Sequence, residues 1–221
     1  MRYNIEGGSL PILEMNLENG ESVITQNGAM IWMSPNMKMD TAAGGIGKAI
    51  GRMFSGESLF LNSYTAMGGP GFITVSSSVP GSIIHFEINP KEPIIVQKTG
   101  FLACTPGVEL SVFFTKKIST GLFGGEGLIM QKLSGNGIAF VEIDGYCKQY
   151  NLAPGQQIVV DTGYLAAMDA TCTMEVKTVP GIKNMFLGGE GLFNTVITGP
   201  GRVFLQSHPV SVLRASLAIP Q

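Results

Sequence analysis

Gly56-Glu57-Ser58-Leu59-Phe60 is the first of three related segments in this chain of 221 residues. It recurs as Gly125-Glu126-Gly127-Leu128-Ile129 and again as Gly189-Glu190-Gly191-Leu192-Phe193. The three glutamates are 69 and 64 residues apart along the chain. Recurrence at a nearly fixed period is typical of one structural unit that is written several times in a chain.

Other landmarks keep step with these segments. A glycine precedes each glutamate by 26 to 29 residues: Gly28, Gly100 and Gly163. Further upstream, an acidic or amide residue follows an aliphatic residue by four positions in each unit: Glu21, Glu92 and Gln156. Because a chance match would not carry its neighbours along, we expect a single compact domain of three internal repeats, approximately 1–78, 79–143 and 144–221.

Within each repeat the chain reads as short strands joined by tight turns. Residues 10–17 are mostly apolar and lead to Asn19-Gly20, a pair that favours a hairpin turn, and residues 22–26 form the returning strand. The later repeats show the same strand pairs, over 83–88 and 94–96 and over 146–152 and 158–160. Each repeat closes with a turn and another strand, over 70–75, 136–141 and 200–205. This pattern predicts an all-β fold of the sandwich or barrel kind.

One connector, residues 44–54, departs from the strand pattern. Its apolar residues fall at the spacing of an amphipathic helix, but its glycines each cost about 1 kcal/mol in a helix interior. The segment is therefore a short helix or a glycine-rich loop. It could rest on its own sheet, dock a partner or touch a membrane surface, and the first of these is the usual role of such a helix.

Composition and charge exclude several classes of protein. Charged residues make up 14% of the chain and the net charge is −2, which gives no reason to expect nucleic acid as a partner. No apolar run of about 18 residues predicts a membrane-spanning helix, and the first residues lack the apolar core of a signal peptide. Three cysteines cannot form a complete disulfide framework, so we expect a cytoplasmic protein.

Several of these motifs together resemble a known family. They are the stretch at 27–33 with Met39-Asp40-Thr41, the segment at 56–60, and the closing stretches at 191–195 and 199–201. The chain is similar over nearly its whole length to bacterial and archaeal proteins related to the altered-inheritance-of-mitochondria protein 24. The resemblance implies three fused β-sandwich-like repeats in a pseudo-threefold arrangement, like the tryptophan RNA-binding attenuation protein, a shortened double-stranded β-helix. Most members have no established biochemical activity, and mitochondrial relatives are linked to inner-membrane organisation.

Basic residues ahead of the glutamate segments are the candidate ligand-binding residues. They are Lys48, Arg52, Lys117 and Lys183. In a pseudo-threefold arrangement they would form a small cationic ring that can hold an anion. Recognition of RNA would require more Lys and Arg beside stacking aromatics than the 14 basic residues scattered here. The competing interpretation of these four is that they are solvated loop charges.

Two interpretations apply to the repeated glutamates Glu57, Glu126 and Glu190. Three equivalent carboxylates near an axis could bind a metal or titrate at a raised pKa. No His, Cys or second carboxylate accompanies them at a repeated position, so we predict no metal site, no cofactor and no catalytic residue. A carboxylate between glycines is suited to accept backbone N–H groups of a tight turn, and we interpret the three glutamates as repeat-junction residues.

The sequence therefore favours a non-enzymatic, β-rich scaffold or interaction protein. An unidentified protein, or a second copy of the chain, is the expected partner, through flat faces or strand edges, with a membrane surface as a weaker alternative. Trp32 is expected at the core or at a subunit boundary. The alternative function is a small-ligand or anion-binding module with sites between the repeats.

Overall fold

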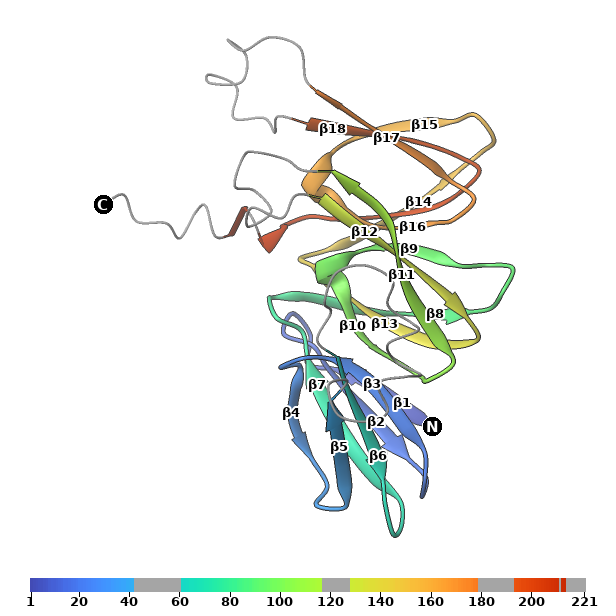
Figure 1. The fold of residues 1–221 in the computed structure, drawn as a ribbon. Coiled ribbons are helices and arrows are strands. Elements are labelled where there is room, and N and C mark those ends of the chain that lie inside the picture. The colour runs from blue at the N-terminus through green and yellow to red at the C-terminus, as the bar shows by residue number, and fades with distance from the viewer. Residues whose placement is uncertain (42–60, 117–127, 179–192, 211, 214–221) are drawn as a thin grey trace.

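The computed structural model describes residues 1–41, 61–116, 128–178, 193–210 and 212–213 (Figure 1). Antiparallel strands dominate this part of the chain, which confirms the predicted all-β fold. Two short 3-10 turns, η1 (Lys98–Gly100) and η2 (Thr162–Tyr164), interrupt the strands. Within the described residues no helix has the length and apolar character needed to cross a membrane. The connector at 44–54 lies outside the described residues.

The strands form four sheets. The first sheet has the order β1 (Arg2–Glu6), β2 (Ile12–Leu17), β7 (Gly71–Ser76), β4 (Met30–Met33). The second has the order β5 (Met37–Thr41), β6 (Leu61–Ala66), β3 (Ser22–Gln26), β10 (Phe101–Cys104), β13 (Gly137–Asp144), β8 (Gly81–Ile88). The third has the order β11 (Val108–Lys116), β12 (Leu128–Gly135), β9 (Ile94–Gln97), β16 (Leu165–Asp169), β19 (Gly201–Gln206), β14 (Cys147–Leu152). The fourth has the order β15 (Gln157–Asp161), β18 (Phe193–Thr198), β17 (Thr173–Thr178).

One pairing scheme recurs three times along the chain. Strands β7, β13 and β19 each lie between two partners, β2 and β4, β8 and β10, and β14 and β16. Strands β6, β12 and β18 likewise lie between β3 and β5, β9 and β11, and β15 and β17. β1 is an addition that pairs with the outer edge of β2. Counterpart strands can therefore be compared residue by residue.

Two further pairings join one set of strands to the next. β3 pairs with β10, with Thr25 opposite Ala103. β9 pairs with β16, with Val96 opposite Ala167. These two pairings, which we call the joints, turn half-sheets of adjacent sets into the two central six-stranded sheets.

The four sheets are stacked as layers with three apolar cores between them (Figure 1). Each central sheet is buried on both faces. Val23 and Ile24 are neighbours on β3 and belong to different cores, and Ile95 and Val96 on β9 do the same. Successive side chains of a strand point to opposite faces, so the continuous apolar runs of β3 and β9 follow from burial on both sides.

The predicted strand positions are confirmed where the structure describes them, but the predicted pairing of neighbouring strands as hairpins is wrong. The strands expected around residues 20, 90 and 155 are β2 and β3, β8 and β9, and β14 and β15. The two strands of each pair do not pair with each other, because the chain passes at each turn from one sheet to the next. The closing strands expected over 70–75, 136–141 and 200–205 are β7, β13 and β19. The expectation that Trp32 lies in the core of the chain is wrong, because half of this residue is exposed on the edge strand β4. The subunit-boundary alternative remains a prediction.

Candidate functional site

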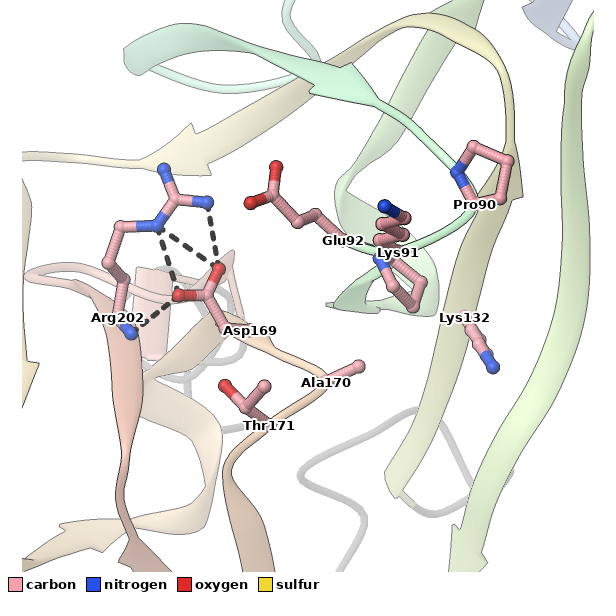
Figure 2. A pocket seen from close by; sticks show the side chains of 9 residues that line it. Pro90, Lys91, Glu92, Lys132, Asp169, Ala170, Thr171 and Arg202 are labelled. Atoms are coloured by element: carbon pink, nitrogen blue, oxygen red, sulfur yellow. Dashed lines mark hydrogen bonds and ion pairs between the residues drawn. The ribbon is translucent and has the colours of Figure 1, made fainter. Parts of the chain in front are cut away.

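A pocket lies beside the joint between β9 and β16. Its wall comes from four places: the turn between β8 and β9, the middle of β12, the end of β16 and the start of β19. The cavity measures about 640 Å³. Figure 2 shows Arg202 and Asp169 at one side, Lys132 at the other, and Glu92 between them. The joint itself thus creates the pocket, because no single set of strands supplies all of its walls.

An ion pair between Arg202 and Asp169 forms one side of the pocket. Arg202 Nε donates to both carboxylate oxygens, at 3.1 and 3.0 Å, and a terminal guanidinium nitrogen lies 2.8 Å from Oδ1. The Arg202 backbone N–H also donates to Asp169 Oδ2 at 2.7 Å. The hydrogen bonds from Asp169 raise the pKa of Arg202 above its usual value. The guanidinium of Arg202 therefore balances the charge of Asp169, and Asp169 holds the guanidinium against the pocket wall.

The remaining charges of the pocket leave a positive excess. Lys91 and Lys132 face a single further carboxylate, that of Glu92. Asn89 Nδ2 donates to Glu92 Oε2 at 2.8 Å, so this carboxylate is held in the turn. Within the described part of the chain, neither lysine forms an ion pair. Two cations beside Pro90, Pro93 and Ala170 are suited to a small anion that has an apolar portion.

A second pocket occupies the counterpart place at the joint between β3 and β10. It measures about 460 Å³ and is lined by Met1, Gly20, Glu21, Ser22, Thr105, Pro106, Gly137 and Ile138. The positive charge in this pocket is the Met1 ammonium, which lies 2.8 Å from Glu21 Oε1. This hydrogen bond is the main reason that the pKa of Glu21 is lowered. Pockets thus form at both joints, with different charges.

The two pockets share a backbone contact that recurs in all three sets of strands. In each set, the backbone N–H of the residue after the glycine of the closing turn donates to a side chain. The acceptor residue directly follows β4 in the first set and β10 in the second, and it is the last residue of β16 in the third. The donors and acceptors are Phe72 N to Ser34 Oγ at 3.0 Å, Ile138 N to Thr105 Oγ1 at 3.0 Å, and Arg202 N to Asp169 Oδ2 at 2.7 Å. A hydroxyl thus accepts in two sets and a carboxylate in the third. The carboxylate acceptor therefore distinguishes the larger pocket from the smaller one.

The site residues predicted from the sequence cannot be compared with this pocket, because the structure does not describe them. Lys48, Arg52, Lys117 and Lys183, and the repeat-junction residues Glu57, Glu126 and Glu190, all lie outside the described residues. Their roles therefore stay predictions. The pocket residues Lys91, Lys132, Asp169 and Arg202 were missed, although Glu92, one of the sequence landmarks, also lines the pocket. The missing information was the pairing of β9 with β16, which brings together residues more than 70 positions apart.

Two further reactive side chains, Cys104 and His85, are packed within the fold. Cys104 is fully buried, and burial raises the pKa of its thiol, so the reactive thiolate is disfavoured. His85 packs its ring against Tyr3 with centroids 5.5 Å apart. Among the residues that the structure describes, no three His, Cys, Asp or Glu side chains gather as a metal site would require.

Comparisons with known proteins place the chain among relatives of similar length. A family model described as mitochondrial biogenesis AIM24 matches residues 3–208. An uncharacterised protein of Streptococcus pyogenes serotype M6 is 27% identical over 217 residues, which cover 94% of this chain and 86% of that protein. A crystal structure of a protein from Streptococcus pyogenes superposes with a TM-score of 0.78 at 24% identity, over 98% of this chain and 97% of the other. The last similarity concerns the fold alone.

Proposed function

The chain belongs to the mitochondrial biogenesis AIM24 family, and from that premise we propose that it is a non-enzymatic scaffold that binds other proteins through the edges of its sheets. Neither the family nor the relative from Streptococcus pyogenes carries an assigned biochemical activity in its description. The proposal therefore depends on the surface of this chain.

The observation that carries the proposal is where exposed apolar side chains lie. Among the described residues, every large apolar side chain that is exposed within a strand lies on an edge strand: Ile31 and Trp32 on β4, Met39 on β5, Val112 and Phe113 on β11, Tyr150 on β14 and Val159 on β15. Edge strands offer unpaired backbone groups, and proteins usually protect them with charge. Apolar side chains on such an edge favour the addition of a strand from another chain.

β11 is the edge that best suits a different protein. Val112 and Phe113 are exposed by 37% and 43%, and a bulge between Val112 and Phe114 interrupts the pairing with β12. β5, β11 and β17 are edge strands in all three sets, so β11 is not required to complete a sheet of its own chain. Its exposed apolar pair is available to a partner strand.

Co-purification with the tagged chain tests the scaffold role. We expect proteins captured by the wild type to be lost from the double variant Val112→Lys with Phe113→Lys. Leu10→Lys is the matched control, because Leu10 is an apolar residue that is 65% exposed and lies outside the strands. Partners that remain bound to the double variant, or their absence from the wild type, would overturn the proposal.

The pocket at the β9 and β16 joint favours a second function, a binding module for small anions. Lys91 and Lys132 supply the positive charge, and the site lies between two sets of strands, as this alternative requires. Calorimetry with inorganic phosphate and with carboxylate metabolites tests it. Binding should be lost in Lys91→Ala with Lys132→Ala and retained in Lys148→Ala, a lysine on β14 away from the pocket. A combined Lys48, Arg52, Lys117 and Lys183 alanine variant tests the predicted cationic ring separately.

The finer architecture and the location of the protein belong to the same proposal. We infer three fused repeats in a pseudo-threefold arrangement, similar to the tryptophan RNA-binding attenuation protein, and the recurring pairing scheme supports the presence of three repeats. A cytoplasmic location is proposed from the cysteine content. Fluorescence microscopy of the tagged chain in its native cell tests the location.

A further inference from the structure

The two outer sheets of the molecule each have half of a joint. In the central sheets, β3 pairs with β10 and β9 pairs with β16. The fourth sheet ends at β15, the counterpart of β3 and β9, and the first sheet ends at β4, the counterpart of β10 and β16. In the part of the chain that the structure describes, neither β15 nor β4 has a partner on its outer side. The outer sheets are thus complementary halves of one further sheet.

β4 retains the local shape of the strands that form joints. Each of the three counterpart strands has a bulge at the same place in its pairing, between Met30 and Trp32, Phe101 and Ala103, and Leu165 and Ala167. The bulge changes the twist of the strand and the aim of the residues that follow it. In β10 and β16, the residue after the bulge is the first that pairs with the joined strand. In β4 that residue is Trp32.

The side chains on the two open edges are more exposed than their counterparts at the joints. Trp32 is 50% exposed, whereas its counterparts Ala103 and Ala167 are fully buried at the joints. Val159 lies two residues before the end of β15 and is 62% exposed. The residues at that position of the joined strands, Ile24 on β3 and Ile95 on β9, are 3% and 0% exposed. Two large apolar side chains are therefore exposed where the joints bury theirs.

The complementary edges β4 and β15 suit a contact between two copies of the chain. Figure 1 shows β4 and β15 at opposite ends of the stacked sheets, so one copy does not bring them together. We propose that β15 of one copy pairs antiparallel with β4 of the next, which joins copies head to tail. The joints set the register: Val160 lies opposite Trp32, as Thr25 lies opposite Ala103 and Val96 opposite Ala167.

This joint between copies would have the strand order of the central sheets. The combined sheet would run β17, β18, β15, β4, β7, β2, as the second sheet runs β5, β6, β3, β10, β13, β8. Each copy contributes a different edge at its two ends, so the contact is heterologous and produces a ring or an open filament. The inference deepens the scaffold role and rests on it, because it names the chain itself as one partner.

Two complementary variants test the head-to-tail contact. Val159→Lys blocks the β15 edge and Trp32→Lys blocks the β4 edge, and Leu10→Lys is the control. By light scattering after size exclusion, the wild type and the control should form species larger than one chain. Each blocked variant alone should have the mass of one chain, because every contact needs both edges. An equal mixture of the two variants should form a dimer with one copy of each, since one intact edge of each kind remains.

Other results would overturn the contact. A wild type with the mass of one chain at all concentrations does so, and so does a blocked variant that still assembles alone, which would indicate a symmetric contact through the remaining edge. A mixture that forms no dimer contradicts the pairing of β15 with β4.

A cysteine pair tests the register. In the proposed contact Met33 lies opposite Val159, as Cys104 lies opposite Ile24. Directly opposite residues of antiparallel strands are close enough for a disulfide. Met33→Cys with Val159→Cys, in a Cys147→Ser background, should give a ladder of covalent multimers on oxidation. A bond within one chain, seen as a monomer of altered mobility, would contradict the contact between copies.

Partner capture by the same proteins separates this inference from the scaffold role. A wild type that is monomeric but still captures partners through β11 would overturn the head-to-tail contact alone. A wild type that assembles but captures no other protein would overturn the scaffold role alone.

Discussion

At the residue scale, Glu142 on β13 is a buried carboxyl group that requires hydrogen-bond donors. Only 4% of this residue is exposed. Its carboxylate accepts from the Ser78 backbone N–H at 2.6 Å, from Ser77 Oγ at 2.9 Å and from Ser78 Oγ at 3.0 Å. These contacts hold the segment between β7 and β8 on the second sheet. Glu142→Ala should lower the free energy of unfolding by about 1–3 kcal/mol, because the Ser78 N–H loses its acceptor, and urea denaturation measures this.

Burial also makes Glu142 a source of pH dependence. It raises the pKa of this carboxyl above 4.5, against the opposing effect of the Ser78 and Ser77 hydrogen bonds. The folded chain thus keeps a proton at pH values where the unfolded chain has released it. The resulting stabilisation is complete below 4.5 and is lost as the pH rises through the folded-state pKa. The pKa of Asp144 is raised as well, chiefly by burial, and acts in the same direction.

Glu142→Gln isolates the contribution of this residue. The variant keeps an acceptor for the Ser78 N–H but has no charge to bury. Relative to the wild type, its free energy of unfolding should therefore increase as the pH rises from about 4 to 8. Denaturation curves measured across this range check the sign. Parallel dependence of the two proteins on pH would contradict a raised pKa at Glu142.

Gly201, which precedes the pocket residue Arg202, illustrates a backbone constraint. Its φ is +145°, and a Cβ at this position would lie 2.7 Å from Cys172 Sγ and from Thr171 Oγ1. Gly201→Ala therefore combines an unfavourable φ with steric overlap, and we expect a loss of about 3 kcal/mol. Gly155→Ala is the control, because Gly155 has φ +75° but no atom within 4 Å of its Cβ position. That variant should lose about 1 kcal/mol. Equal losses in thermal unfolding would contradict the steric part.

At the element scale, strands inside the central sheets are more completely buried than strands at open edges. Phe140 on β13 is fully buried in the core between the first and second sheets, and Tyr3 packs edge-on against it with centroids 4.8 Å apart. Phe140→Ala should cost about 3–5 kcal/mol of stability, because the cavity lies between two sheets that cannot collapse onto it. Val159→Ala on the open edge of β15 should change stability by less than about 0.5 kcal/mol. Chemical denaturation of both variants checks the contrast.

The elements also show which information the sequence holds. Strand positions were predictable because the turns at Asn19-Gly20 and Ala153-Pro154-Gly155, and the apolar runs beside them, are local signals. The pairing of β3 with β10 was not, since it depends on contacts between residues about 80 positions apart and on a register that the bulge at Phe101 shifts. The pocket at Lys132 and Arg202 exists only through such a pairing, so the candidate site was missed.

At the scale of the whole molecule, the joints connect the three cores to one another. Each central sheet is a wall of two cores, and neighbouring residues such as Val23 and Ile24 contribute to different ones. Loss of one core would therefore expose an apolar face of a sheet that the next core requires. Repeat proteins with weaker contacts between units unfold in parts, but shared sheets favour a single transition here.

This coupling predicts that both ends of the molecule unfold together. Trp32, the single tryptophan, reports on the first sheet. Trp32→Phe with Tyr164→Trp moves the probe to η2, whose residue Tyr164 packs against the core between the third and fourth sheets. Urea transitions followed by tryptophan fluorescence in the two proteins, and by circular dichroism in both, should share one midpoint once corrected for the stability change of the variant. A midpoint at the fourth sheet that differs from the circular dichroism midpoint of the same protein would show that the outer cores unfold independently, and that the joints do not couple them.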